Sequence, residues 1–238
     1  MSKKVIGIFP KVELPFTEDP FQDRYSVVNN YARRVYEANA IPVGLLLNNG
    51  EISTEELDLC DAFLLPGGNK IDPNVYKLLE YAREHDKPVL GVCMGMQEMM
   101  IYSVLYDDGA NPFNKEEYKI AYDNMKTNDP VLHKLEDNTL HFHEPQYDLD
   151  GIRHLITVDE NSLLSEIYNS TKLNVVSLHG VITQRTGSLL NIVAHSEDGV
   201  IEAVENKDML WLGVQYHPEI DDNDILIKSF IERLERRK

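Results

Sequence analysis

The residues best suited to chemistry in this chain form two short segments, one near the middle of the sequence and one near its end. The first reads Gly-Val-Cys-Met-Gly-Met-Gln over residues 91–97 and follows the apolar run at 88–90. A strand that turns sharply into a helix through Gly-x-Cys-x-Gly is typical of a nucleophile elbow. We therefore predict that Cys93 is a thiol nucleophile at a helix N-terminus, where the thiolate is favoured.

The second segment, Gly-Val-Gln-Tyr-His-Pro-Glu over residues 213–219, supplies the groups that a thiol nucleophile needs. His217 is a candidate general base. Glu219 lies two residues further on, so in an extended segment both side chains fall on one face. The carboxylate can then orient the imidazole, which is the third role in a catalytic triad. Cys93 and His217 are far apart in the sequence, so the fold must bring them together.

These motifs together resemble the class I glutamine amidotransferase superfamily, whose members cleave a γ-glutamyl amide through a thioester. A third match is the run Leu-Leu-Pro-Gly-Gly over residues 64–68, and the resemblance extends from Lys4 to about Phe230. It implies a flavodoxin-like α/β fold, with a mostly parallel sheet covered by helices on both faces and some antiparallel strands in the C-terminal third. It also implies a reaction that needs no cofactor.

Within that superfamily, the chain is most similar to the γ-glutamyl-γ-aminobutyrate hydrolase family of free-standing enzymes. The similarity lies in the run Ala-His-Ser-Glu-Asp-Gly-Val-Ile-Glu-Ala-Val-Glu over residues 194–205 and in Ser177, Leu178 and His179. The Gly-Gly-x-Leu-x-Gln-like stretch that follows the nucleophile helix in that family is missing. The pocket segment Asn-Ser-x-His-His-Gln is here Val-Ser-Leu-His-Gly-Val over residues 176–181. The sequence therefore does not identify the amine half of the substrate.

The glycines after the third motif are candidates for an oxyanion hole. Gly67 and Gly68 could simply form a turn, but Gly68 can offer an unobstructed backbone N–H to a developing oxyanion. The N–H of Met94, just after the nucleophile, would be the second donor. Gln97 could contact the glutamyl group or face the core of the turn.

Two further functions use the same motifs or the same fold. One is a glutaminase subunit that supplies ammonia to a partner synthetase, with the same nucleophile, base and oxyanion groups. The other is a non-catalytic binding module, which the complete set of Cys93, His217 and Glu219 disfavours. Turnover of glutamine compared with other γ-glutamyl amides distinguishes these functions.

The histidines outside the triad carry weaker signals. His141 and His143 are spaced to share one face of a strand and could begin a metal site. No third ligand at a convincing spacing is visible, so we predict no metal and a substrate-wall or surface role. His179 could line the substrate pocket or could be a structural histidine.

Composition agrees with an enzyme that acts on a small molecule. The chain has 238 residues and a formal net charge of −17, which argues against nucleic acid or anionic lipid as the main ligand. No apolar run approaches the roughly 20 residues of a membrane span. The two cysteines, Cys60 and Cys93, give no disulfide framework, so a reduced, cytoplasmic setting is expected. A homodimer is possible.

Alternating strand and helix patterns predict a single domain over residues 1–238. The strands are expected at 5–9, 41–47, 62–65 and 89–92, and the helices at 25–39, 74–85, 97–102 and 225–236. Residues 53–56 have capping-box spacing, which predicts that a short helix follows. Residues 139–216 hold shorter strand-like runs, some of them expected to be antiparallel. Periodicity weakens between about 106 and 150, and we expect that region to cover the active site. In such folds catalytic loops follow the carboxyl ends of strands.

Overall fold

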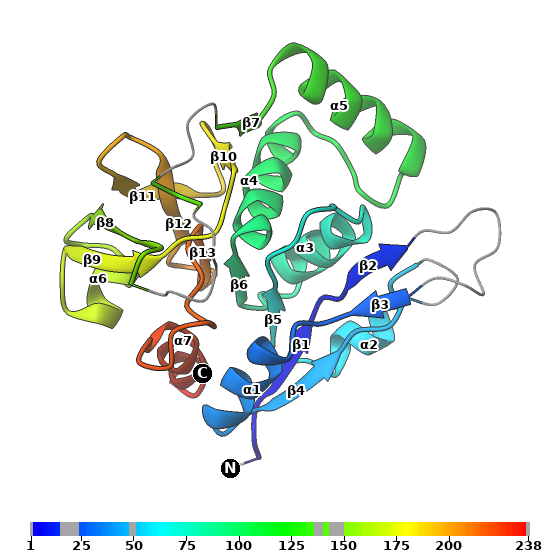
Figure 1. Cartoon of the computed structure of the whole chain (residues 1–238). Coiled ribbons are helices and arrows are strands. Elements are labelled where there is room, and N and C mark those ends of the chain that lie inside the picture. Colours follow the sequence, from blue (N-terminus) through cyan, green and yellow to red (C-terminus); the bar gives the residue numbers. More distant parts are fainter. Residues whose placement is uncertain (1, 15–23, 48–50, 136–139, 143–149, 237–238) are drawn as a thin grey trace.

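The computed structural model describes residues 2–14, 24–47, 51–135, 140–142 and 150–236. Its central element is a nine-stranded sheet with the order β4-β1-β5-β6-β13-β12-β11-β8-β9 (Figure 1). The parallel half contains β4 (Ile41–Gly44), β1 (Val5–Ile8), β5 (Ala62–Leu65), β6 (Val89–Val92) and β13 (Trp211–Val214). β5, β6 and β13 have every residue buried, as strands covered by helices on both faces require.

The other half of the sheet is antiparallel and comes from the C-terminal part of the chain. It contains β12 (Ile201–Asn206), β11 (Asn191–Ser196), β8 (Arg153–Val158) and β9 (Lys172–Val176). β8 alternates buried and exposed residues, as expected for a strand with one solvated face. Two small two-stranded sheets pair β2 (Lys11–Leu14) with β3 (Arg24–Ser26), and β7 (Leu132–Lys134) with β10 (Val181–Thr183). The prediction of a mostly parallel sheet with antiparallel strands late in the chain is confirmed.

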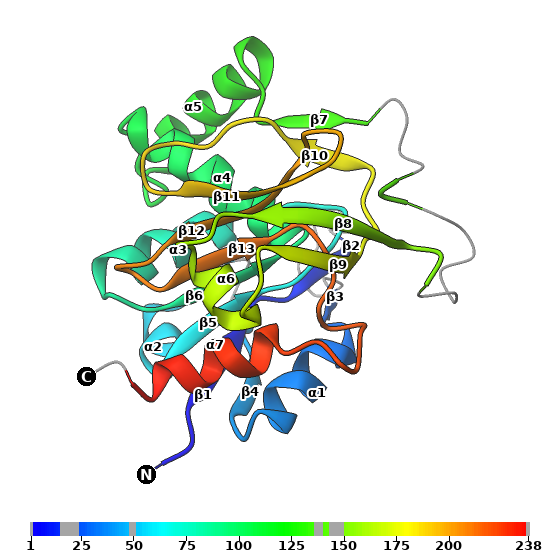
Figure 2. The ribbon, with the colours of Figure 1, turned by 90° about the vertical axis from the view of Figure 1, so that its left-hand side faces the viewer.

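Two apolar cores lie on the two faces of the sheet. One is covered by α1 (Asn29–Glu37), α6 (Leu163–Tyr168) and α7 (Leu226–Leu234). Figure 2 shows α6 and α7 in front of the strands. The other face is covered by α2 (Thr54–Asp58), α3 (Asn74–Glu84), α4 (Met94–Asp107) and α5 (Lys115–Asn128). Among the described residues, none of the helices combines the length and apolar character needed to span a bilayer.

One predicted helix begins later than expected, and one observed helix was not predicted. The helix expected over 25–39 begins only at Asn29, because residues 24–26 form β3 and pair with β2. The weakly periodic region after Tyr106 contains the 14-residue helix α5, which the sequence analysis did not predict. Only Tyr118 and Met125 of α5 are buried, so the helix lacks the apolar stripe that reveals most helices. The side chain of Asn114 caps it by accepting from the N–H of Glu117.

Candidate active site

Three neighbouring parallel strands deliver the segments that the sequence analysis singled out. β5 ends just before Gly67, β6 ends just before Cys93, and β13 ends three residues before His217. β5 pairs with β6, and β6 pairs with β13. Because parallel strands end at the same edge of a sheet, the three loops meet there. The N–H of Cys93 also donates to the carbonyl of Val214 over 2.8 Å, which ties the two loops together.

Cys93 occupies a strained backbone conformation between β6 and α4. Its φ is 53° and its ψ is −109°, and only 7 % of the residue is exposed. Such a conformation in a non-glycine residue costs on the order of 1–3 kcal/mol and is common at functional sites. The flanking glycines allow the turn. A Cβ at Gly95 would lie 2.1 Å from the carbonyl oxygen of Leu65, and one at Gly91 would lie 2.8 Å from the backbone of Gly95.

His217 is held by a short hydrogen bond to Glu219. Nδ1 of the imidazole lies 2.7 Å from Oε1 of Glu219, whose side chain is 4 % exposed. Burial opposes protonation of the imidazole, but the charges of Glu219 and Cys93 outweigh burial and raise the pKa of His217 well above its ordinary value. An imidazole that holds its proton more tightly favours the thiolate form of a neighbouring cysteine. The backbone N–H of His217 donates to the carbonyl of Val176 over 2.8 Å.

Gly67 lies between Cys93 and His217. A Cβ at this position would be 3.0 Å from Cε1 of His217, 3.2 Å from the hydroxyl oxygen of Tyr31 and 3.4 Å from Cβ of Cys93. These distances bring the three predicted segments into one site. The N–H of Gly67 donates to the Tyr31 hydroxyl over 3.0 Å, so this N–H is already used within the protein.

The two N–H groups predicted to form an oxyanion hole are those of Gly68 and Met94. Within the described part of the chain, the hydrogen bonds found include none donated by either N–H. Met94 begins α4, so its N–H has no acceptor within the helix. A Cβ at Gly68 would lie 2.9 Å from the Met94 side chain, which shows that the two residues are neighbours.

Tyr31 is a residue of the site that the sequence analysis missed. It is 1 % exposed and lies on the inner face of α1. Burial and the charge of Glu219 raise the pKa of its hydroxyl well above the ordinary value, so the group is neutral. Its hydroxyl thus faces both Glu219 and the loop of Gly67. In the sequence Tyr31 fits the apolar stripe of a helix, so nothing there separates it from a core residue.

The predicted substrate contacts fall into two groups. The amide nitrogen of Gln97 donates to the carbonyl of Val181 over 2.9 Å and to the side chain of Gln215 over 3.0 Å. Gln97 is therefore packed inside the fold, the second of the two alternatives. Ser177 is fully buried and His179 nearly so, whereas Leu178 is half-buried. The Ser177 hydroxyl and the N–H of His179 both donate to the carbonyl of His141 over 3.0 Å.

A pocket of about 410 Å³ adjoins the predicted oxyanion loop. It is lined by Lys11, Ser26, Val27, Val28, Pro66, Gly67, Gly68, Asn69 and Lys70. The lining contains two lysines and no acidic residue, in a chain that is otherwise strongly acidic. A larger pocket of about 610 Å³ lies between α3 and α5, and its lining includes Tyr76 and Tyr118 but none of the triad. The larger pocket is therefore not the catalytic one.

A comparison with known protein families finds one family that matches most of the chain. The sequence model of the peptidase C26 family matches residues 4–78 and 76–219. The chain belongs to the peptidase C26 family. This match covers most of the protein, and it contains all three loops described above.

Individual relatives agree with the family. A glutamine amidotransferase-like protein of Rickettsia prowazekii, RP404, is 26% identical over 96% of this chain and 95% of its own length. The CTP synthase of Parvibaculum lavamentivorans is 28% identical over 82% of this chain, but that match spans only 40% of the synthase. The glutaminase domain of Trypanosoma brucei CTP synthase, solved with bound acivicin, has a TM-score of 0.68. At 19% identity and 99% coverage of this chain, it shows a shared fold.

Proposed function

We propose that this peptidase C26 protein hydrolyses a γ-glutamyl amide through a thioester on Cys93 and releases glutamate and an amine. The observation that carries the proposal is the arrangement of three groups. Cys93 sits at a strained turn, against an imidazole whose Nδ1 lies 2.7 Å from the carboxylate of Glu219. A thiol, a base and an orienting carboxylate in this order are the parts of a cysteine-dependent amide hydrolase.

The first half of the reaction forms the thioester. The Cys93 thiolate attacks the γ-carbonyl carbon, a C–S bond forms, and the negative charge moves to the carbonyl oxygen. The N–H groups of Gly68 and Met94 donate to that oxyanion. His217 then gives its proton to the leaving nitrogen, the C–N bond breaks, and the amine departs.

The second half of the reaction returns the enzyme to its starting state. His217, now neutral, takes a proton from water, and the resulting hydroxide attacks the thioester carbon. The same two N–H groups stabilise the second oxyanion. The C–S bond breaks, glutamate leaves, and the Cys93 thiolate faces the His217 imidazolium again. The Glu219 carboxylate stabilises that imidazolium in both halves of the reaction.

The pocket beside the oxyanion loop suits the glutamyl half of the substrate. A γ-glutamyl group carries a free α-carboxylate, and Lys70 gives the pocket positive charge, whereas Nζ of Lys11 lies 3.2 Å from the buried carboxyl of Glu98. The amine half would leave on the opposite side, toward the segment 176–181. Three polar groups of the related hydrolases are replaced in that segment, at Val176, Gly180 and Val181. We therefore expect an amine other than plain γ-aminobutyrate.

A second candidate is a glutaminase that supplies ammonia to a synthetase. The observation favouring it is the similarity to CTP synthases, of which this chain spans 40% in the case cited. Both functions use the same triad and the same oxyanion donors. They differ in the substrate that the isolated protein prefers and in whether a second protein is needed.

The thioester chemistry can be tested by trapping the nucleophile. A γ-glutamyl analogue whose γ-carbon bears an electrophilic leaving group should add once to the purified protein, and peptide mapping should locate the adduct on Cys93. Cys60→Ala should react like the wild type, because Cys60 is buried among core residues and burial raises the pKa of its thiol to about 11. Labelling of Cys60 with Cys93 unmodified, or no adduct at all, would overturn the mechanism.

A further inference from the structure

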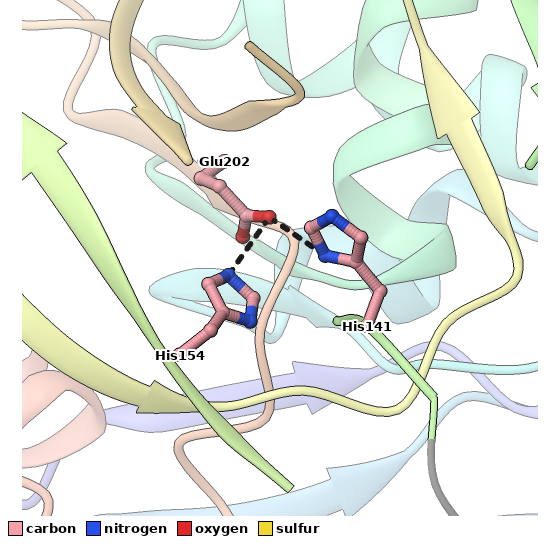
Figure 3. Close-up of side chains that lie close together, drawn as sticks. All are labelled: His141, His154 and Glu202. Atoms are coloured by element: carbon pink, nitrogen blue, oxygen red, sulfur yellow. Dashed lines mark ion pairs between the residues drawn. The ribbon is translucent and has the colours of Figure 1, made fainter. Parts of the chain in front are cut away.

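Four side chains that the proposed hydrolysis does not use converge beside the active site. Figure 3 shows three of them: His154 of β8, Glu202 of β12 and His141 from the segment 140–142. Oε1 of Glu202 lies 3.2 Å from Nε2 of His154 and 3.4 Å from Nδ1 of His141. The facing ligand atoms of these three residues all lie within 4.8 Å of one another.

His179 brings a third nitrogen close to the same carboxylate oxygen. Its Nε2 lies 3.6 Å from Oε1 of Glu202, and its ring centroid lies 4.7 Å from that of His141. The imidazoles thus surround one carboxylate from three different chain segments. The sequence analysis paired His141 with His143, which lies outside the described residues, and found no third ligand.

This cluster is deeply buried, and its hydrogen bonding is poor. Glu202 and His141 are fully buried, and His154 and His179 are each 4 % exposed. Among the described residues, seven polar atoms of the cluster find no hydrogen-bond partner of normal geometry: both oxygens of Glu202, both nitrogens of His154, both nitrogens of His179 and Nδ1 of His141. An unsatisfied buried polar group costs about 1–3 kcal/mol, and a charged one costs more. A single cation bound between these oxygen and nitrogen atoms would satisfy several of them at once.

The spacing of the ligand atoms of His141, His154 and Glu202 fits a metal ion. Ligand atoms at about 2.0–2.1 Å from a tetrahedral Zn²⁺ lie about 3.3 Å from one another. The distances from the Glu202 oxygen to the nitrogens of His154 and His141 are 3.2 and 3.4 Å. Two imidazoles and one carboxylate form a ligand set that suits borderline divalent metals and leaves a fourth coordination position open.

The outer contacts of His141 have the form found around metal ligands. Its Nε2 lies 3.0 Å from Oδ2 of Asp198, while its Nδ1 faces Glu202. A metal-bound imidazole usually donates its other N–H to a carboxylate, which fixes the tautomer and the orientation of the ring. Asp198 is in turn held by the hydroxyl of Ser196, over 2.5 Å.

We propose that His141, His154 and Glu202 form a binding site for one divalent transition metal ion of the Zn²⁺ type, with His179 beside it. The ion joins β8, β12 and the segment at 140–142. The carbonyl of His141 accepts hydrogen bonds from Ser177 and His179, and the neighbouring carbonyl of Val176 accepts from the N–H of His217. The ion therefore fixes the wall of the catalytic site next to its base.

The experiment uses the full-length, tag-free chain carrying Cys93→Ala, so that the catalytic thiol cannot bind the added ion and no turnover is involved. The result is thus independent of the proposed hydrolysis. After dialysis against a chelator, Zn²⁺ is added in competition with a chromogenic chelator, and bound metal is measured by elemental analysis. We expect one tightly bound Zn²⁺ per chain and a Tm that rises when Zn²⁺ is added.

Variants in the same background locate the ion. His154→Gln and Glu202→Gln should each lose the tightly bound Zn²⁺, and Asp198→Asn should weaken binding by about 10- to 100-fold. His195→Gln is the matched control, because His195 is exposed on the neighbouring strand β11 and should leave binding unchanged. Tight Zn²⁺ that persists in both folded ligand variants would overturn the site.

A second measurement needs no ligand variant to fold. Co²⁺ bound to the Cys93→Ala chain should give the intense visible absorption of a tetrahedral site with nitrogen and oxygen ligands, and Zn²⁺ should displace it. A weak, octahedral-type spectrum, or failure to bind one Zn²⁺ per chain, would contradict the proposal whatever the variants do.

Discussion

At the scale of single residues, the proposed mechanism gives proton transfer to His217 and the orientation of its ring to Glu219. His217→Ala removes the imidazole proposed to carry the proton beside Cys93 and should lower kcat/KM by at least about 10³-fold. Glu219→Ala leaves the proton acceptor in place and removes only its orientation and charge, so its loss should be about tenfold smaller. Steady-state kinetics on both variants, with folding checked by circular dichroism, measures this order. A Glu219 variant that is more damaged than the His217 variant would contradict the assigned roles.

The charge of Glu219 also sets the pH range of activity. Because Glu219 raises the pKa of His217, Glu219→Gln should lower it. The imidazolium that stabilises the thiolate then loses its proton at lower pH, so the alkaline limb of the kcat/KM profile should move to lower pH. An alkaline limb that stays in place would show that Glu219 orients His217 without affecting its charge.

Glu98 gives a prediction about stability rather than activity. Burial raises its pKa to about 7, although Lys11 lies 3.2 Å away and acts in the opposite direction. Between pH 4.5 and 7 the folded protein therefore holds a proton that the unfolded chain has lost. The contribution of this group to the free energy of unfolding should fall as pH rises through that window, by up to about 3 kcal/mol.

Glu98→Gln removes this titration and isolates the effect. The difference in unfolding free energy between wild type and Glu98→Gln should become less favourable to the wild type from about pH 5 to about pH 8. Urea unfolding at several pH values measures it, with Glu84→Gln at the exposed end of α3 as the matched control. A difference that does not change with pH would show that the carboxyl of Glu98 ionises normally.

At the scale of elements, α1 is hydrogen-bonded to two of the loops that form the candidate site. Its Tyr31 hydroxyl accepts from the N–H of Gly67 and faces Glu219, and its Arg34 donates to backbone carbonyls of Glu219 and Asp222. Tyr31→Phe leaves the Gly67 N–H unpaired and frees the loop that carries the oxyanion donor. We expect kcat to fall about tenfold, or about 1.4 kcal/mol, with KM changed less than about twofold.

The control for this prediction lies on the same helix. Tyr36 is 69 % exposed, so Tyr36→Phe should leave both kinetic constants unchanged. If Tyr31→Phe changed only KM, or only the Tm, Tyr31 would be a core residue and not a positioning residue.

The elements also show what the sequence could and could not predict. β5 and β6 were predicted because each is a short apolar run followed by glycine or by the motif itself, whereas β13 was expected only as one of the shorter strand-like runs over residues 139–216. α5 was missed because its exposed surface hides the helical period. The His154 and Glu202 pair was missed because β8 and β12 lie on either side of β11 in the sheet, so that only the fold brings the two residues together. A signal for His154 was present, since it alternates with Ile156 and Val158 on the buried face of β8.

At the scale of the whole molecule, the question is whether the chain works alone. A free-standing hydrolase must have its catalytic groups in place without a partner. Here the triad, the elbow and the two candidate oxyanion N–H groups are assembled within one chain. A glutaminase that serves a synthetase gains from staying idle until that partner binds. We therefore expect the isolated chain to turn over a γ-glutamyl amide.

The most direct test is a side-by-side kcat/KM series on the isolated protein. Glutamine, γ-glutamyl-γ-aminobutyrate and amides with bulkier or less charged amines are compared, with glutamate release read by mass spectrometry. We predict that some substituted amide is cleaved at least about tenfold better than glutamine, or about 1.4 kcal/mol in transition-state binding, and that Cys93→Ala cleaves none. Glutamine as the best substrate, with turnover that rises only when a second protein is added, would contradict the hydrolase and favour the glutaminase subunit.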